Sequence, residues 1–319
     1  MRKGNSKKEK VEGKLVKQYT VSEILDKVTS YLKREGIPEP GIDAGVLLAH
    51  VLEIERLEIY LNLDCRVTEK ELSAYKKLIE RRVKREPVAF IVGYKEFMGL
   101  KFFLNKHVLI PRPETEILVE KVIEKAQNIR KSESYGYGRD SSLTIVDLCT
   151  GSGNIAISLA RNIASCKIYA IDISEGAIQV ARRNARFHKV EGRVEFLLGD
   201  LFSPLEELNS DLAVDFVVSN PPYVKSRDLV LLPPEIKKEP LSALEGGNEG
   251  LNFYQRIIPE ALKYLIDGGY LIMEIGDYQG KAVMNLIKKE KQFYPSQLVK
   301  DYAGLDRVVV AQKLRKGGQ

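Results

Sequence analysis

A polar corner, Asn220-Pro221-Pro222-Tyr223, stands directly behind the apolar run VDFVVS at residues 214–219. Proline has no N–H to donate and restricts the residue before it to extended conformations, so strand pairing is given up where the run ends. Two acceptors result from this rigid corner: the side-chain oxygen of Asn220 and the carbonyl oxygen of Pro221. Such a pair matches the two N–H bonds of one planar NH₂ group.

This acceptor pair suits methylation of a planar amino group. Resonance spreads the lone pair of such a nitrogen into the neighbouring π-system, as in the peptide group, which makes it a poor nucleophile. Two acceptors that hold its hydrogens favour pyramidal geometry and direct the lone pair at a sulfonium methyl, through orientation and charge stabilisation. Tyr223 is expected to stack on the substrate and to face the positive charge. No histidine is needed, because the proton can leave to water after transfer.

A glycine-bearing turn and an acidic residue predict a nucleotide pocket near this corner. Gly151 and Gly153 lie between an apolar run and a helical segment, where glycine lets a ligand approach the main chain. Asp172 ends the next apolar run about 20 residues later, where a carboxylate can accept both hydroxyls of a ribose. A plain strand-to-helix turn remains the alternative for the two glycines alone.

A third position follows the next apolar run along the chain. Asp200 can accept from an adenine amino group while Leu201 and Phe202 pack on the ring, although a turn or helix-capping role is open for Asp200. Open α/β sheets bind ligands at the carboxyl ends of their strands, where all of these positions are expected. An NAD-linked dehydrogenase shares the glycine turn and the acidic residue. Asp147, four residues before Gly151, and the polar corner argue against a dehydrogenase. Together with Gly151, Gly153 and Asp172, Asp147 makes the sequence resemble a class I S-adenosylmethionine-dependent methyltransferase.

The elements that must position these residues begin after a charged tail. Residues 1–17 hold seven Lys or Arg against two Glu and are expected to be disordered. They carry most of the net charge of +6, so the charge does not identify a partner. Residues 18–88 show apolar positions at helical spacing and predict a small helical domain, with Ser22 able to cap the first helix.

Residues 89–110 predict a β-hairpin linker. They are rich in Phe, Val, Ile and Tyr, and Met98-Gly99 stands at the middle. A helix is expected to follow, entered through Pro113 and Glu114.

Residues 111–316 predict an α/β domain with a largely parallel sheet. Short apolar runs alternate there with helical segments, which is typical of βαβ units. The runs are LTIVDLC, KIYAIDI, RVEFLL, VDFVVS, GGYLIMEI and RVVVAQK. The segment KSESYGYGRDSS is expected to be a polar loop before the first of them, and residues 317–319 a flexible end.

Cysteine usage and hydropathy limit the remaining classes. Three cysteines and three histidines lie far apart, which predicts neither a disulfide framework nor a metal site. No run approaches about 18 apolar residues, and the N-terminus lacks an apolar signal segment. We therefore expect a cytoplasmic protein without membrane attachment.

Several segments together resemble the HemK/PrmC family, the N5-glutamine methyltransferases of peptide chain release factors. The resemblance covers residues 18–316. It is carried by REPVAFIVGYKEFMGLKFFLN, VLIPRPETEILVE, DLCTGSGNIAISLA, AIDIS, VVSNPPYV and EPLSALEGGNEGLNFY.

The resemblance implies a fold, a cofactor and a partner. The fold is a seven-stranded, Rossmann-like methyltransferase domain, preceded by a helical domain that helps to dock the release factor and by a hairpin linker. The reaction is S-adenosyl-L-methionine-dependent methylation of the glutamine amide in a Gly-Gly-Gln motif, without a need for direct nucleic-acid binding.

The resemblance also implies the roles of individual residues. The glutamine would be held by Asn220, Pro221, Pro222 and Tyr223. The cofactor would be bound by Cys149, Thr150, Gly151, Ser152, Gly153, Asp172, Asp200, Leu201 and Asn220. Cys149 departs from the family, which usually has glycine there. Arg112 and Glu114 are expected to shape the cofactor pocket or to start the helix.

Two other functions stay open at this stage. The four-residue corner also occurs in enzymes that methylate exocyclic amino groups of RNA or DNA. A non-catalytic nucleotide-binding or docking protein is the third reading, and the intact Asn220 counts against it.

Overall fold

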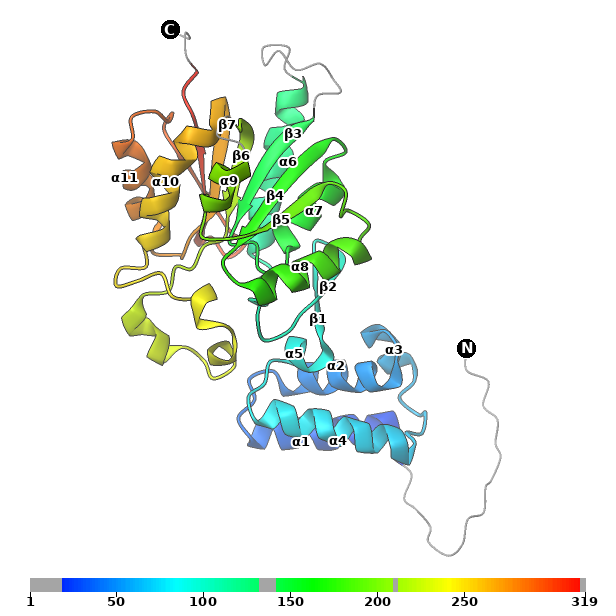
Figure 1. The fold of residues 1–319 in the computed structure, drawn as a ribbon. Coiled ribbons are helices and arrows are strands. Elements are labelled where there is room, and N and C mark those ends of the chain that lie inside the picture. The colour runs from blue at the N-terminus through cyan, green and yellow to red at the C-terminus, as the bar shows by residue number, and fades with distance from the viewer. Residues whose placement is uncertain (1–18, 132–141, 209–211, 316–319) are drawn as a thin grey trace, which may run out of the picture. The chain divides into compact units, whose positions relative to one another are not determined.

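The computed structural model describes residues 19–131, 142–208 and 212–315, and this part of the chain divides into two compact units after Val92 (Figure 1). The expected tail of residues 1–17 and the end at 317–319 lie outside the described residues. Residues 132–141, which form nearly all of the expected polar loop, also lie outside the described residues.

The first unit is built from helices. They are α1 (Val21–Arg34), α2 (Pro40–Leu52), α3 (Arg56–Leu61), α4 (Glu69–Val83) and α5 (Val88–Val92). Thr20, not the predicted Ser22, caps α1: its side chain accepts from the Glu23 N–H, and the Glu23 carboxylate accepts from the Thr20 N–H. This reciprocal capping box satisfies two backbone donors that a helix start leaves free.

The core of the first unit is apolar and contains a buried hydrogen bond between two of its helices. Leu32, Leu47 and Leu48 are fully buried within it. The hydroxyl of Tyr75 donates to the carbonyl oxygen of Ala44 at 2.8 Å. These contacts join α4 to α2.

The linker is shorter than predicted, because its first residues belong to the helical unit. The N–H groups of Phe90 and Ile91 donate to the carbonyl oxygen of Pro87, which starts a helical turn, and Ile91 is buried in the first core. The hairpin itself comprises β1 (Tyr94–Phe97) and β2 (Leu100–Phe103). Met98 and Gly99 both have positive φ at its turn, which matches the twist of two antiparallel strands.

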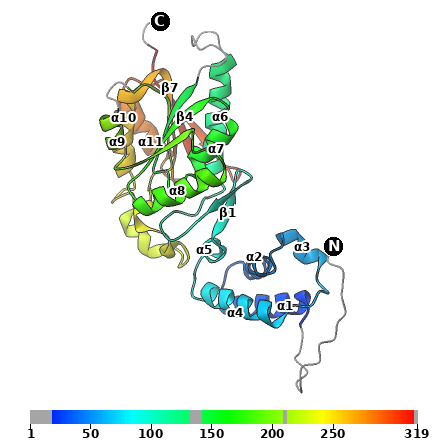
Figure 2. The same ribbon diagram turned by 45° about the vertical axis from the view of Figure 1, so that its right-hand side comes forward.

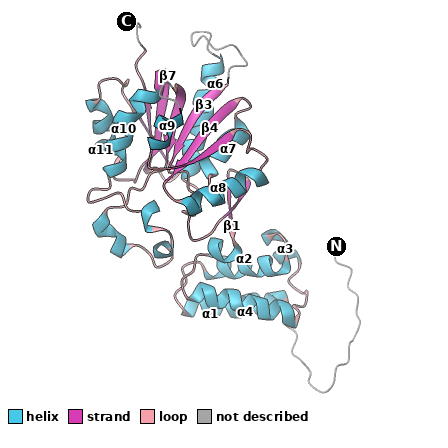
Figure 3. Cartoon of the chain, viewed as in Figure 1, coloured by secondary structure: helices cyan, strands magenta, loops and turns pink. Residues whose placement is uncertain are grey.

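The second unit contains a seven-stranded, mostly parallel sheet (Figure 3). Its strands are β3 (Leu143–Leu148), β4 (Cys166–Asp172), β5 (Val194–Leu198), β6 (Val214–Ser219), β7 (Leu265–Glu274), β8 (Gln297–Lys300) and β9 (Asp306–Gln312). The order is β5-β4-β3-β6-β7-β9-β8, and only the pairings of β9 are antiparallel. The expected class I fold is confirmed, although the short edge strand β8 was not predicted.

Helices cover both faces of this sheet. They are α6 (Thr115–Lys131), α7 (Asn154–Asn162), α8 (Glu175–Phe187), α9 (Ser203–Leu208), α10 (Asn252–Tyr264) and α11 (Gly280–Lys289). One apolar core joins α6, α7 and α8 to the sheet, and a second joins α9, α10 and α11 to it. Figure 2 shows the sheet between these two layers.

The four parallel strands β3 to β6 place the predicted site residues together. Their carboxyl ends meet at one edge of the sheet, so segments 149–153, 172–174, 200–201 and 220–223 converge although they span more than 70 positions.

Candidate active site

A cavity of about 420 Å³ lies at this edge of the sheet. Most of the predicted site residues line it: Cys149, Thr150, Gly151, Ser152, Asp172, Asp200, Leu201, Asn220 and Pro222. Gly153, Pro221 and Tyr223 are not among its lining residues. The cavity is more apolar than polar and is formed within the second unit alone.

The turn after β3 depends on backbone conformations that most residues avoid. Cys149, Gly151 and Gly153 have φ values of 59°, 54° and 79°. Cys149, which stands where the family resemblance leads us to expect glycine, therefore occupies a left-handed conformation. Gly153 caps α7 and packs behind the cavity, where an added Cβ would lie 3.0 Å from Ile157 and 3.1 Å from Ala181.

Asp147 holds this turn from below. It is fully buried and accepts from the Thr150 hydroxyl at 2.6 Å. Burial raises its pKa to about 7, against the hydrogen bond from Thr150, which favours the charged form. Asp147 thus links the end of β3 to Thr150 in the cavity wall.

Asp172 lies at the end of β4 with its carboxylate fixed by two backbone donors. The Gly151 N–H donates to Oδ2 at 2.8 Å and the Ser174 N–H donates to Oδ1 at 2.9 Å. Burial raises the pKa of Asp172, and these two hydrogen bonds oppose that effect. A carboxylate has about four lone-pair sites, so acceptor capacity remains for hydroxyl groups of a ligand.

The segment after β5 contributes Asp200 and Leu201, but not Phe202. Asp200 is exposed and pairs with Arg256 at 2.6 Å, and the buried Leu201 lines the cavity. Phe202 is fully buried and stacks on Tyr264 with ring centroids 5.1 Å apart. The prediction that Phe202 packs on the ligand was therefore wrong, because successive residues at this turn point into different environments.

The corner after β6 places Asn220 in the cavity wall. Its side-chain Nδ2 donates to the hydroxyl oxygen of Thr115 at 3.2 Å. Since the amide nitrogen is engaged there, the other end of the amide, the acceptor Oδ1, is left for a ligand.

The rest of the corner is packed against two other segments. Val224 exchanges backbone hydrogen bonds with Leu244 and Gly246, at 2.8 and 2.7 Å. The side chain of Gln279 donates to the carbonyl oxygen of Tyr223 at 3.2 Å. These contacts fix the backbone that carries the proline pair.

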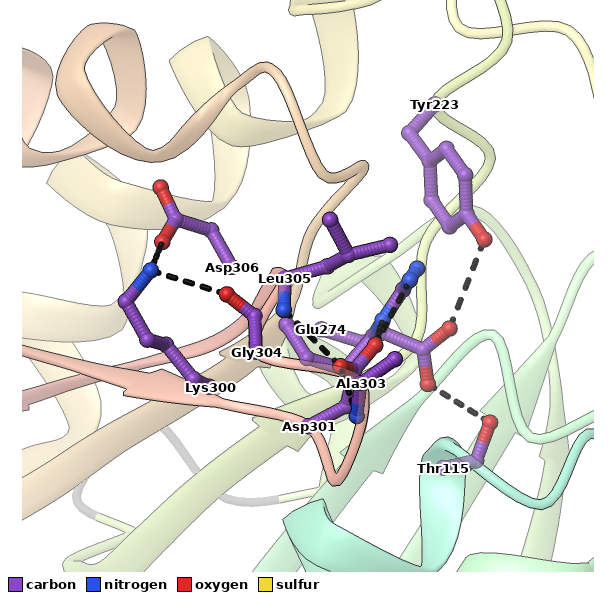
Figure 4. Close-up of polar contacts among 10 residues, drawn as sticks. Thr115, Tyr223, Glu274, Lys300, Asp301, Ala303, Gly304, Leu305 and Asp306 are labelled. Carbon is purple, nitrogen blue, oxygen red and sulfur yellow. Dashed lines mark hydrogen bonds and ion pairs between the residues drawn. The ribbon is translucent and has the colours of Figure 1, made fainter.

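Tyr223 is not among the residues that line the cavity, and Figure 4 shows its hydroxyl directed at Glu274. Its hydroxyl donates to Oε1 of Glu274 at 3.4 Å, and the hydroxyl of Thr115 donates to Oε2 at 2.6 Å. Burial raises the pKa of Glu274 to about 7 and also raises that of Tyr223.

Thr115 and Glu274 were missed by sequence reasoning. Thr115 stands within the segment PRPETE, and Glu274 interrupts the apolar run YLIMEI, where a single acidic residue at a strand end is the available signal. Arg112 lines the cavity and pairs with the buried Glu239, which also accepts from the Ile110 N–H at 2.9 Å. The loop before α6 is thereby joined to the segment that follows the corner.

Within the described residues, no three His, Cys, Asp or Glu side chains are grouped so that they could hold a metal ion. No helix in that part of the chain is both long and apolar enough to cross a membrane.

The fold and the site together define a class I S-adenosylmethionine-dependent methyltransferase. Two family models match the chain: a PrmC N-terminal domain at residues 23–93 and a methyltransferase domain at residues 139–313. The solved structure of the human METTL16 catalytic domain aligns with a TM-score of 0.54 at 14% identity, over 75% of this chain and 84% of that one, and supports the fold alone.

Curated relatives narrow the class further. The release factor glutamine methyltransferase of Thermodesulfovibrio yellowstonii is 42% identical over 85% of this chain and 92% of its own length. That of Geobacter sulfurreducens is 36% identical over 91% and 96%. The chain belongs to the family of release factor glutamine methyltransferases.

A test of the corner's packing uses Gly246. A Cβ at this position would lie 2.7 Å from the Tyr223 Cα and 2.8 Å from the Pro222 carbonyl oxygen. Because these are backbone atoms, we expect Gly246→Ala to lower the free energy of unfolding by about 1 to 3 kcal/mol. Urea denaturation measures this change.

Gly192→Ala is the matched control, since an added Cβ there meets nothing within 4 Å. It should stay within about 0.5 kcal/mol of the wild type. Equal stability of the two variants would contradict the packing described for the corner.

Proposed function

We propose that this chain methylates the side-chain amide of the glutamine in the Gly-Gly-Gln motif of a peptide chain release factor, with S-adenosyl-L-methionine as methyl donor. Family membership supports the reaction and its substrate class. The observation that carries the site assignment is the Asn220 amide, held by Thr115 at the wall of a cavity that also contains Asp172.

The cavity residues fit the cofactor. Asp172 retains acceptor capacity for ribose hydroxyls, and Leu201 gives an apolar wall suited to an adenine ring. The left-handed turn at Cys149 and Gly151 brings main chain to the cavity surface. When bound, the cofactor supplies an electrophilic methyl group on a sulfonium centre.

The corner would hold the substrate amide. Oδ1 of Asn220 and the carbonyl oxygen of Pro221 would each accept one N–H bond of the glutamine side chain. This grip reduces the delocalisation of the nitrogen lone pair and stabilises the positive charge that nitrogen acquires. Pro222 fixes the backbone of Pro221, and the ring of Tyr223 would stack on the substrate beside it.

The helical unit is proposed to dock the body of the release factor. Exposed apolar side chains on α3, namely Leu57, Tyr60 and Leu61, offer a surface for such contact. A substrate that acts in translation termination would place the reaction in the cytoplasm. The alternative, methylation of an exocyclic amino group in RNA or DNA, is not favoured by the names of the relatives.

The proposed function is tested with radiolabelled cofactor and a purified release factor. We expect label to enter the native factor and not a factor whose Gly-Gly-Gln glutamine is replaced by alanine. Asn220→Ala should lower kcat/KM by about 30- to 1000-fold, the effect of removing one interaction of about 2 to 4 kcal/mol from a desolvated transition state.

Two results would contradict this proposal. One is transfer of label to a nucleic acid while release factors stay unlabelled. The other is an unaltered kcat/KM in Asn220→Ala.

The cofactor site is tested separately at Asp172. Asp172→Ala should weaken cofactor binding more than tenfold, because about 1.5 to 3 kcal/mol is typical of hydrogen bonds to a charged group. Isothermal titration measures the affinity. Glu195→Ala, which removes a half-buried carboxylate paired with Lys167, is the control and should bind normally. Equal affinity of both variants would refute the assignment of Asp172.

A further inference from the structure

A buried carboxylate lies behind the corner and joins two of its residues. Glu274 is the last residue of β7, one position beyond Met273, which pairs with Ser219 at the end of β6. Its side chain lies between Thr115 and Tyr223 in Figure 4. Only 1% of Glu274 is exposed, so it does not meet the substrate itself.

Burial raises the pKa of Glu274 to about 7, and two neighbouring groups oppose that effect. Arg307, on β9, favours the ionised form of Glu274, as does the hydrogen bond from Thr115. Arg307 is itself held by Asp301, whose Oδ2 accepts from Nε at 3.3 Å and from Nη2 at 3.1 Å. Glu114 acts in the opposite direction and raises the pKa of Glu274.

Oε2 of Glu274 acts as a hydrogen-bond acceptor, and this fixes the direction of the next two hydrogen bonds. The hydroxyl of Thr115 has one proton, which it donates to Glu274 Oε2 at 2.6 Å. Toward Asn220 the same oxygen can therefore only accept. The Asn220 Nδ2 donates to it at 3.2 Å. The NH₂ end of Asn220 is thus bound to Thr115, and the oxygen end is turned to the other side.

This direction matters because the two ends of an asparagine amide have nearly the same shape. If Asn220 were turned over, it would present a donor to the substrate, which also presents only N–H donors at its amide nitrogen. Stereochemistry alone does not prevent that rotation. The hydrogen bonds from Asn220 to Thr115 and from Thr115 to Glu274 prevent the rotation, because Glu274 accepts the only hydroxyl proton of Thr115.

We propose that Glu274 and Thr115 are positioning residues, which set the orientation of the Asn220 amide so that Oδ1 faces the substrate, while Glu274 also holds the hydroxyl of Tyr223. This inference rests on the proposed function and assigns a role to two residues outside the Asn-Pro-Pro-Tyr corner. It also explains why a carboxylate is buried at the end of an apolar strand.

The test compares three substitutions that differ in which buried hydroxyl they remove or keep. Thr115→Val keeps the shape of the side chain and removes the hydroxyl. Thr115→Ser keeps the hydroxyl. Tyr75→Phe removes a buried hydroxyl from the helical unit and serves as a control for loss of stability alone. Each variant is assayed for kcat and KM with the native release factor, for cofactor affinity by titration, and for thermal unfolding.

We expect Thr115→Val to lower kcat by about ten- to a hundredfold, since a misplaced amide forfeits orientation in the transition state. Its cofactor affinity should stay within about twofold of the wild type, because Thr115 makes no hydrogen bond to the turn or to Asp172. Thr115→Ser should recover most of kcat, and Tyr75→Phe should retain it.

Three results would overturn the inference: an unchanged kcat in Thr115→Val, equal impairment in Thr115→Ser and Thr115→Val, or a loss of kcat in Tyr75→Phe as large as in Thr115→Val. If Thr115→Val fails to fold, Glu274→Gln provides the second measurement. The amide introduced by this substitution can donate to Thr115 and so reverse the direction of the hydrogen bonds to Asn220. We expect kcat to fall while cofactor binding is retained, and an unchanged kcat again contradicts the inference. A wild type that does not methylate a release factor removes the proposed function, and this inference with it. If the wild type methylates a release factor and Thr115→Val is fully active, the proposed function stands and only this inference is contradicted.

Discussion

The direction of hydrogen bonding at the corner after β6 is the constraint on which the proposed chemistry depends. An amide substrate presents N–H donors, so the protein must present acceptors, and a proline pair suits this need because it adds no backbone N–H groups of its own. The asparagine amide can adopt two orientations, because its two ends have nearly the same shape although one donates hydrogen bonds and the other accepts them. In this structure that choice is made by Thr115, which receives the amide nitrogen of Asn220 because its own proton is given to Glu274.

The fold supplies the rigidity that this arrangement requires. Parallel strands bring their carboxyl ends to one edge, and glycines at positions 246 and 250 allow a second backbone segment to lie directly against the corner. The side chain of Gln279 bridges the carbonyl oxygens of Tyr223 and Gly250 at 3.2 and 2.9 Å. The cofactor half of the cavity is held in a similar way, with Asp172 fixed by the backbone N–H groups of Gly151 and Ser174. Little reorganisation is then needed at the moment of reaction.

Much of the fold and the local motifs could be predicted from the sequence, and the tertiary contacts between them could not. Alternating apolar runs indicate a parallel sheet, and the topology of such sheets alone brings Gly151, Asp172 and Asn220 to one edge. The role of Glu274 depends instead on Thr115, 159 residues earlier, and no periodicity reports such a contact. Phe202 illustrates a related limit, since composition does not tell which of two neighbouring apolar side chains faces a cavity. The strand β8 was not predicted, because it is short and half exposed and therefore lacks a continuous apolar run.

The central claim is that Asn220 and Pro221 jointly accept both N–H bonds of a glutamine amide. A crystal structure of the protein with the demethylated cofactor product and a Gly-Gly-Gln peptide tests it most directly. The account predicts that the glutamine nitrogen lies about 2.7 to 3.2 Å from both Asn220 Oδ1 and the Pro221 carbonyl oxygen, with Asn220 Nδ2 still on Thr115. A glutamine nitrogen bound elsewhere in the cavity, or an Asn220 amide turned so that its nitrogen faces the substrate, would contradict it.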